Sequence, residues 1–482
     1  MSRCRPACCL LAVLLALTVT PVFAAKTLVR LEGLSQAQMQ EYARQGYDIP
    51  RQGPGFIEVV VETAEAKKMA AVRGARVSTV IADLDKYVSE VRAGETADAK
   101  YFTYQTMLDA LKGYVEKYPK ICRLESIGKT FENRDIWALK VSDHPEKDEA
   151  EPAVMVVGDH HSREWISVEV PMATIKALLE GYGADERMTR LVDSREIWFI
   201  PMLNPDGMTY SQTKDRYWRK NRRKNADGSF GVDPNRNYGY KWALIGSSNY
   251  PNSDTYHGTG AFSEAETQAI RDLAAREKFS ADISFHSYSE LILYPWSFTS
   301  DQQCEHHALF AKFAGEMANF NKYTPQQSSD LYPTGGDFDD YLYAEHKSLS
   351  FTFELATTFI PAATQIAPIC AANVPAVLHL IDKAGTYGLV TPAGAATLAS
   401  LDTPSAVAAL ADLAPFAGQE DAAARLSALQ AEVARRLVAE RAAGTSEVAD
   451  ALAKLPADQP MVRAVRQTAA QMQSFADLHG EK

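Results

Sequence analysis

The feature that most restricts the fold is a series of short apolar runs separated by stretches with helical spacing. Four of these runs cover residues 153–157, 196–200, 281–285 and 348–353. Each has about the usual length of a strand. Apolar strands that alternate with helices indicate a mainly parallel sheet covered on both faces. We therefore predict an α/β fold with a mixed, mainly parallel central sheet flanked by helices. In such sheets ligands gather at the carboxyl ends of strands, so chemistry is expected there.

The chain of 482 residues is too long for one ordinary domain. Its composition, with 46% hydrophobic and 23% charged residues, is globular. We predict four parts: a signal peptide (1–24), a small α/β block (25–97), a block that carries the sheet (98–385) and an alanine-rich helical extension (386–482). The formal net charge of −11 gives no overall attraction to nucleic acid or to an anionic membrane.

The first 24 residues have the pattern of a secretory signal. Arg3 and Arg5 precede an apolar stretch at 9–19, and small residues near Ala24 offer a cleavage site. The stretch is short for a membrane span, although an uncleaved anchor is the alternative. No later segment approaches 18 uninterrupted apolar residues. We expect a secreted or periplasmic protein without stable membrane insertion.

The two flanking parts differ in their patterns. In the N-terminal block we expect strands at 26–31, 56–61 and 77–81, a helix from Ser35 to Arg44 and a second helical stretch from Ala64. Residues 95–100 form a plausible linker and protease target. The C-terminal extension contains a helical segment at 420–443 and almost no strand formers. Beyond the signal segment, Cys122, Cys304 and Cys370 allow at most one internal disulfide.

A candidate metal site follows the first of the buried strands. His161 and Glu164 are three residues apart there, and an imidazole with a carboxylate suits zinc. Catalytic zinc normally has three protein ligands and one open position, and His286, after another buried strand, is the best third ligand. His160 competes for the first position, but it points away from His161 if the chain is extended. On spacing alone, each histidine is equally compatible with an ordinary strand-end hydrogen bond.

Other residues could supply a general base, an anion-binding group and a cation beside such a metal. Glu354 ends an apolar strand, where burial would tune it as a general base, although such a carboxylate can also face solvent. Asn235 and Arg236 offer a group that can pair with a terminal carboxylate. Arg219 could stabilise an oxyanion. It lies in the basic run 216–224, and such runs more often form a solvated face.

Seven short segments together resemble the carboxypeptidase A-type zinc metallocarboxypeptidases, in particular secreted bacterial, carboxypeptidase T-like members. They are HSREW (161–165), NPDG (204–207), WRK (218–220), VDPNRN (232–237), FHSY (285–288), LYP (293–295) and FTFEL (351–355). They occur in the family's order over about 280 residues, roughly 60% of the chain. The resemblance implies one Zn²⁺ held by His161, Glu164 and His286.

The resemblance also implies roles for individual residues. Glu354 matches the general base and Arg219 the arginine that polarises the scissile carbonyl. The residues that would bind substrate are Arg163, Asn235, Arg236, Tyr288 and the mobile Tyr332. Asp233 matches the carboxylate that orients a zinc-bound histidine. The implied reaction is hydrolysis of the C-terminal peptide bond, with water activated by zinc and Glu354.

Specificity stays open in the sequence. The segment 336–340 resembles the floor of the side-chain pocket, but its glycine pair is one residue closer to Tyr332 than in the pancreatic enzymes. Phe338 facing inward would favour apolar terminal residues, whereas Asp337 would favour Lys or Arg, and both could contribute.

The N-terminal block is compatible with the family's antiparallel activation segment, which covers the active-site cleft, or with a retained accessory domain. We expect a monomer whose partners are peptide or protein C-termini, with no nucleic-acid partner. Two alternatives remain: the same fold could act on cell-wall peptides or small amides, or a non-catalytic relative could bind peptides.

Overall fold

The computed structural model describes most of the chain. The described residues are 25–69, 75–84, 86–87, 101–149, 151–388, 403, 406–407, 409–410, 420–455 and 460–479. The predicted signal peptide (1–24) and the predicted linker (95–100) lie outside them.

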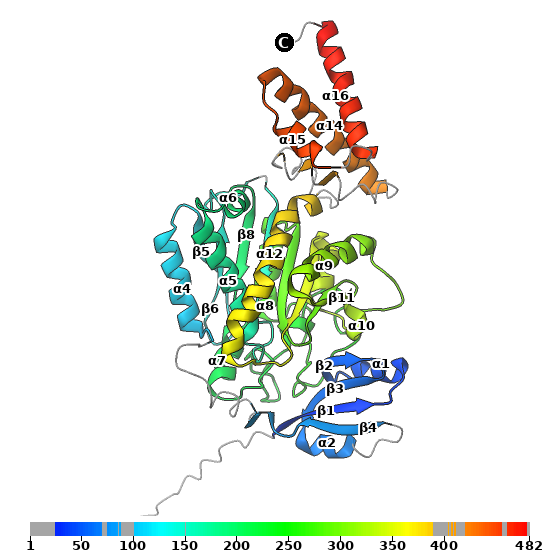
Figure 1. Cartoon of the computed structure of the whole chain (residues 1–482). Helices are drawn as coiled ribbons and strands as arrows, with labels where there is room; N and C mark the ends of the chain where they lie inside the picture. Colours follow the sequence, from blue (N-terminus) through cyan, green and yellow to red (C-terminus); the bar gives the residue numbers. More distant parts are fainter. Residues whose placement is uncertain are drawn as a thin grey trace, which may run out of the picture.

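An eight-stranded mixed sheet forms the centre of the molecule (Figure 1). Its strands are β5 (Cys122–Lys129), β6 (Asp135–Val141), β7 (Ala153–Val157), β8 (Glu196–Ile200), β9 (Ala281–Ser287), β10 (Leu291–Tyr294), β11 (Thr324–Gln327) and β12 (Leu349–Leu355). Their order is β11-β10-β12-β9-β7-β8-β6-β5. The middle strands β12, β9, β7 and β8 run parallel, whereas β10 and β6 pair antiparallel with this group. The expected mixed α/β class is confirmed.

Helices cover both faces of this sheet. They are α4 (Tyr104–Lys117), α5 (Ile166–Gly181), α6 (Glu186–Val192), α7 (Pro205–Thr213), α8 (Ala265–Glu277), α9 (His307–Asn321), α10 (Ser328–Leu331), α11 (Phe338–Tyr341) and α12 (Ile366–Gly388), with short helical turns η1 (Pro234–Arg236), η2 (Leu342–His346) and η3 (Ala363–Gln365).

The two faces of β7 show how one strand supports two cores. Val154 and Val156 join the core under α5, α9 and α12, whereas Met155 and Val157 join the core under α8. Side chains alternate between the faces of a strand, so a strand that is buried on both sides must be apolar throughout. This is why the strand pattern is so clear in the sequence.

One helix of the described residues is long and apolar enough to cross a membrane. It covers Ala363–Ala384 with a mean hydropathy of 1.4. The helix packs on α5, α9 and the central strands β7 and β9. Its residues Val377, Leu380 and Ile381 are fully buried there, so this part of the helix belongs to the core of the sheet domain.

The N-terminal block is a small antiparallel α/β unit. Its elements are β1 (Lys26–Glu32), α1 (Gln36–Arg44), β2 (Asp48–Gly53), β3 (Phe56–Glu62), α2 (Thr63–Met69) and β4 (Arg76–Ile81), with the sheet order β2-β3-β1-β4. Ser35 caps α1 in a reciprocal pair with Gln38. Strand β2 was not expected, because Pro50 and polar residues hide its pattern. As an edge strand it tolerates a proline.

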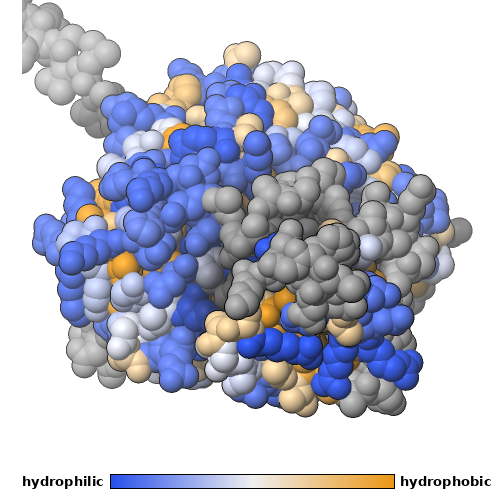
Figure 2. All heavy atoms as spheres, turned by 90° about the horizontal axis from the view of Figure 1, so that it is seen from above, coloured by the Kyte–Doolittle hydropathy of each residue, from blue (hydrophilic) through white to orange (hydrophobic). Residues whose placement is uncertain are grey.

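The C-terminal extension consists of α14 (Glu420–Ala443), α15 (Glu447–Ala453) and α16 (Pro460–His479), which pack on one another. They lie at the end of the sheet domain opposite the N-terminal block (Figure 1). Seen from this end, the described surface is mostly hydrophilic, with apolar patches beside the grey atoms (Figure 2). The described cysteines Cys122, Cys304 and Cys370 are free and buried, so they form no disulfide.

Candidate metal centre and active site

A tight turn after β7 presents the first two candidate ligands. A Cβ atom on Gly158 would lie 2.4 Å from the carbonyl oxygen of Ser167 and 2.6 Å from that of Pro201, so only glycine fits. Asp159 follows with a φ of 59°, a conformation that few residues other than glycine adopt easily. The chain therefore turns sharply at the end of the strand, and the next residues face the carboxyl edge of the sheet.

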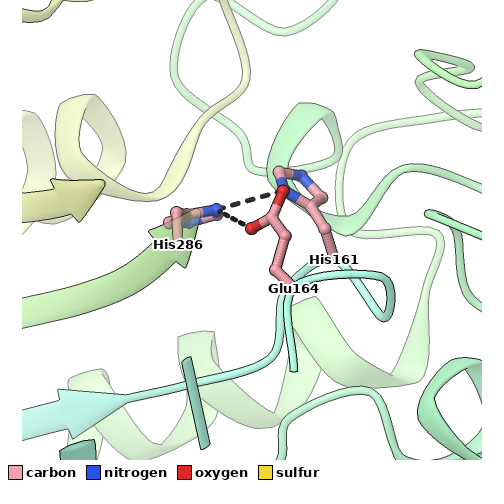
Figure 3. A group of neighbouring side chains, drawn as sticks. All are labelled: His161, Glu164 and His286. Atoms are coloured by element: carbon pink, nitrogen blue, oxygen red, sulfur yellow. Dashed lines mark hydrogen bonds and ion pairs between the residues drawn. The ribbon is translucent and has the colours of Figure 1, made fainter. Parts of the chain in front are cut away.

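His161, Glu164 and His286 converge on one point (Figure 3). The Nδ1 atom of His161 lies 2.9 Å from Oε1 of Glu164. The Nδ1 atom of His286 lies 3.0 Å from Oε2 of Glu164 and 3.1 Å from Nδ1 of His161. All three side chains are buried. Two residues from the turn after β7 thus meet one from the end of β9.

This group fits a zinc ion. Zinc bonds of ~2.0–2.2 Å at tetrahedral angles would place the ligand atoms roughly 3.3–3.6 Å apart, close to the observed spacing. Burial by itself would raise the pKa of Glu164, but His161 and His286 beside it hold that pKa well below its usual range. Burial lowers the pKa of His286. A carboxylate together with imidazole nitrogens is the donor set that zinc binds.

Asp233 and Arg219 support this group from one side. The Nε2 atom of His161 lies 3.1 Å from Oδ1 of Asp233. Arg219 donates from Nε and Nη2 to Oδ2 of the same carboxylate, at 3.0 and 2.8 Å. Burial would raise the pKa of Asp233, but the charges of Arg219 and His161 hold it well below its usual range. Arg219 is only 4% exposed, so this part of the basic run is not a solvated face.

Glu354 lies beside the ligands because of strand pairing. In the parallel pair of β9 and β12, Glu354 is the direct partner of His286. Burial, and then the charge of Glu164, raise the pKa of Glu354 well above its usual range. Its side chain lines a cavity together with His161 and Arg219. It is therefore placed to exchange a proton with a molecule bound there.

Arg236 and Asn235 line the same cavity and also a second one further along the edge of the sheet. Nε and Nη1 of Arg236 donate to the carbonyls of Gly246 and Asn235, at 2.9 and 2.7 Å, which fixes the guanidinium plane. Tyr332 borders both cavities, with its ring centre 6.0 Å from the Arg236 guanidinium carbon. The predicted clamp residues are thus together at the junction of the two cavities.

The lining of the second cavity shows which residues of the segment 336–340 face it. Asp337 and Asp339 both line it, with Leu293 and Thr352, and Phe338 does not. Phe338 is fully buried on the other side, where its ring packs on His160 and Tyr238. In the structure Asp337, rather than Phe338, therefore lies on this cavity, and a part for Phe338 in substrate binding stays an untested prediction. Helix α11 starts at Phe338, and successive residues of a helix point in different directions.

The N-terminal block reaches into this site. Nη2 of Arg163 donates to Oδ1 of Asp48 at 2.7 Å, and Nη1 of Arg219 lies 3.8 Å from the same oxygen. Tyr288 donates its hydroxyl to Glu58 at 2.8 Å. The cavity shared by Asp48 and the three candidate ligands has a volume of about 30 Å³, room for about one water molecule. The block therefore fills the space above the ligands.

Three residues at the site were not expected from the sequence. Asp339 and Asp48 line the cavities, and Ser284 contacts the rear of His286. His160, which the sequence offered as a competing ligand, stacks on His286 instead. A signal existed for Ser284, because it precedes His286 by two residues and shares its face of the strand. Asp48 gave no signal, since its role depends on how the two blocks pack.

Comparisons with known proteins agree with this geometry. Residues 107–376 match the family model described as zinc carboxypeptidase. The zinc carboxypeptidase of Saccharothrix mutabilis subsp. capreolus is 34% identical over 355 residues, 67% of this chain and 81% of the relative. Human carboxypeptidase B is 32% identical over 350 residues, 70% of this chain and 82% of the relative.

Among solved structures, carboxypeptidase A from Helicoverpa armigera has the same fold. Its TM-score is 0.68 at 22% identity, covering 75% of this chain and 98% of the other. Thrombin activatable fibrinolysis inhibitor gives a TM-score of 0.63 at 25% identity, covering 75% and 99%. The chain belongs to the zinc carboxypeptidase family, and it is a metallocarboxypeptidase, a peptide hydrolase with zinc as its cofactor.

Proposed function

We propose that the protein is exported and removes single residues from the C-termini of peptides, with zinc held by His161, Glu164 and His286. The proposal is supported most by one juxtaposition: Glu354, Asn235 and Arg236 line the same cavity as the three ligands. A water-activating group and a carboxylate clamp on one cavity are what an exopeptidase needs. The apolar segment at 9–19 supports export.

Each residue has a part in the proposed hydrolysis. Bound zinc would polarise the scissile carbonyl and lower the pKa of water. Glu354 takes a proton from the attacking water and gives it to the leaving amine. Arg219 donates to the oxygen on which negative charge develops. Asp233 orients the ring of His161.

Arg236 and Asn235 bind the terminal carboxylate in this proposal, and Tyr332 closes over it. Such a clamp demands a free chain end and thereby excludes internal peptide bonds. Arg163 and Tyr288 contact the residues that precede the cleaved bond.

For specificity, we propose that the enzyme prefers Lys or Arg as the terminal residue. Asp337 and Asp339 line the pocket, and burial raises the pKa of both. Asp339 accepts hydrogen bonds through Oδ1 from Ser350 and Thr352, while Oδ2 takes part in neither bond. An ammonium or guanidinium group is the partner that would stabilise these carboxyl groups in their charged form.

We further propose that the N-terminal block keeps the enzyme inactive until it is removed. Asp48 presents a carboxylate to Arg163 and Arg219, the cations expected to meet substrate. The block is also held by an ion pair between Lys26 and Asp254 at 2.7 Å. Cleavage between the two blocks would open the cavity.

A peptide panel tests the central proposal. Peptides that end in Lys, Arg, Phe, Leu or Glu are incubated with the protease-treated enzyme, with and without a zinc chelator. We expect release of the terminal residue, fastest for Lys and Arg, and loss of release with the chelator. The same peptides with amidated C-termini are the matched control and should be resistant.

Two outcomes would replace this proposal. Release from cell-wall peptides alone would favour the alternative substrate class. Binding of peptides without any release would favour the non-catalytic relative.

A further inference from the structure

His160 occupies a position that the reaction described above does not use. It is adjacent to His161 in sequence, yet it is not part of the ligand group. The side chain is fully buried, and its ring stacks on that of His286 with centroids 5.3 Å apart and planes 17° apart. It lies directly behind a proposed ligand.

A chain of short hydrogen bonds joins this ring to the metal centre. The Nε2 atom of His286 lies 2.9 Å from Oγ of Ser284. The same Oγ lies 2.9 Å from Nδ1 of His160. The Nε2 atom of His160 lies 2.8 Å from the hydroxyl of Tyr238. Ser284, His160 and Tyr238 are all fully buried, so no solvent competes for these bonds.

Metal binding by His286 determines where the protons lie in this series of hydrogen bonds. His286 faces Glu164 and His161 through Nδ1, so as a ligand it must carry its proton on Nε2. That proton is donated to Ser284. His286 and His160 are the two partners described for Oγ of Ser284. A buried hydroxyl that accepts from His286 therefore satisfies its own proton by donating to Nδ1 of His160, which places the proton of His160 on Nε2, facing Tyr238.

The serine alone could not enforce this arrangement. A hydroxyl group can donate as well as accept. If Ser284 donated to Nε2 of His286, the proton of that ring would move to Nδ1 and remove the lone pair that faces the metal. An acceptor behind Ser284 prevents this, because it takes the hydroxyl proton. His160 supplies that acceptor.

We propose that His160 is a positioning residue that, through Ser284, fixes the tautomer and orientation of His286 for zinc binding. This inference rests on the proposed function, since it takes His286 to be a ligand. Partners of ligating histidines typically change metal affinity by 10- to 100-fold when they are lost. The effect should therefore be measurable on zinc affinity itself.

The test compares two amide variants of the full chain. In His160→Asn, Oδ1 stands three bonds from Cα, as Nδ1 does, so an acceptor for Ser284 remains. In His160→Gln, the amide lies one bond further out and corresponds to Nε2. Metal-free protein is titrated with Zn²⁺ against a chromophoric chelator, and circular dichroism checks the fold.

We expect His160→Gln to weaken zinc binding roughly 10- to 100-fold and His160→Asn to stay within about threefold of the parent chain. In a Ser284→Ala background, His160→Gln should cause little further loss, because both changes break one chain of bonds. If His160→Gln does not fold, His160→Leu carries the same expectation, since it removes both ring nitrogens without adding an unpaired polar group.

Zinc affinity of His160→Gln equal to that of the parent chain would overturn the inference. Equal losses in His160→Gln and His160→Asn would also overturn it, because they would indicate packing alone. The ligand assignment is checked separately: if His286→Ala binds zinc as tightly as the parent chain, the proposed function fails regardless of His160.

Discussion

Two buried carboxyl groups at the metal end of the active site, Glu164 and Asp233, behave in the opposite way to those at the pocket end. Glu354, which lines both cavities, has a raised pKa like the pocket end. At the metal end, nearby cations and histidines outweigh the effect of burial and hold the pKa values of Glu164 and Asp233 below their usual range. At the pocket end, burial and then the charge of Asp337 raise the pKa values of Asp339 and Asp340 well above it. Burial also raises the pKa of Asp282, beneath the pocket, to about 7.

The difference lies in the neighbours rather than in burial. Arg219 and two histidines stand among the carboxylates of the metal end. The pocket is lined by Asp337, Asp339 and Arg236, and the carboxyl groups of Asp340 and Asp282 are close enough to interact with Asp339. A carboxyl group without a cation keeps its proton when it is buried. We infer that the pocket is completed by a positive charge from the substrate, whereas the metal end is completed by the metal ion.

The largest expected effect concerns Glu354. Changing Glu354 to Gln removes the proposed base but leaves the three ligands intact. The rate of peptide hydrolysis should fall by roughly 10²- to 10⁴-fold, with zinc content unchanged, as measured by peptide turnover and metal analysis of one preparation. The exposed Glu345, changed to Gln, is the control. Full activity of Glu354→Gln would remove Glu354 from the mechanism.

The second prediction concerns stability at the pocket end. Asp282 has a pKa of about 7 in the folded chain and about 3.9 when unfolded. Below the lower value it is protonated in both states. As pH rises towards 7, only the unfolded state releases its proton freely, so stability falls. Three pKa units correspond to at most about 4 kcal/mol.

Asp282→Asn tests this, because an amide cannot ionise. The thermal unfolding of the parent chain and of the variant is measured from about pH 4 to 8. Between pH 4 and 7, the free energy of unfolding should fall more for the parent chain than for the variant. Parallel curves for the two chains would mean that Asp282 is ionised in the folded state and that the contrast between the two ends is wrong at this residue.

The third prediction concerns substrate choice. Asp339→Asn should lower kcat/KM for peptides ending in Lys or Arg by roughly 10- to 100-fold, because a hydrogen bond to a charged group contributes about 1.5–3 kcal/mol. Peptides ending in Phe should change little. Asp337→Asn, measured alongside, shows which carboxyl group dominates. Equal losses on Lys and Phe peptides would point to damage to the fold instead.

The smallest expected effect concerns Asp48, which adds a carboxylate to the metal end from outside the sheet domain. In the uncleaved chain, Asp48→Ala should raise activity about two- to tenfold, a factor of ten being about 1.4 kcal/mol. The increase should be small because the contacts of Glu58 and Lys26 still hold the block in place. The exposed Glu41, changed to Ala, is the control. If proteolytic removal of the block left activity unchanged, the block would be an accessory domain.

The sequence was most informative where a strand determines the position of a residue. Glu354 and His286 are strand-end residues of buried apolar runs, and parallel pairing brings such ends together. The strands β7, β8, β9 and β12 were visible for the same reason, since burial on two faces imposes an apolar pattern, whereas β5, β6, β10 and β11 were not predicted.

The sequence was less informative where neighbouring elements determine direction. Whether Phe338 or Asp339 faces the pocket depends on where α11 begins, and both alternatives are compatible with the same sequence. Strand β2 and its Asp48 gain their place from packing between blocks. The sequence disfavoured His160 as a ligand only on the condition of an extended chain, and its bonds to Ser284 and Tyr238 involve residues distant in sequence.

The pairing of β9 with β12 has a consequence for biogenesis. His286 and Glu354 stand side by side only in one register, and a slip of one residue would turn either side chain to the opposite face. The two candidate histidine ligands are also 125 residues apart, so the ion cannot be captured tightly until the centre of the sheet has assembled. Zinc uptake would thus report completed folding, and chains that arrive misassembled at their destination would remain without metal and inert.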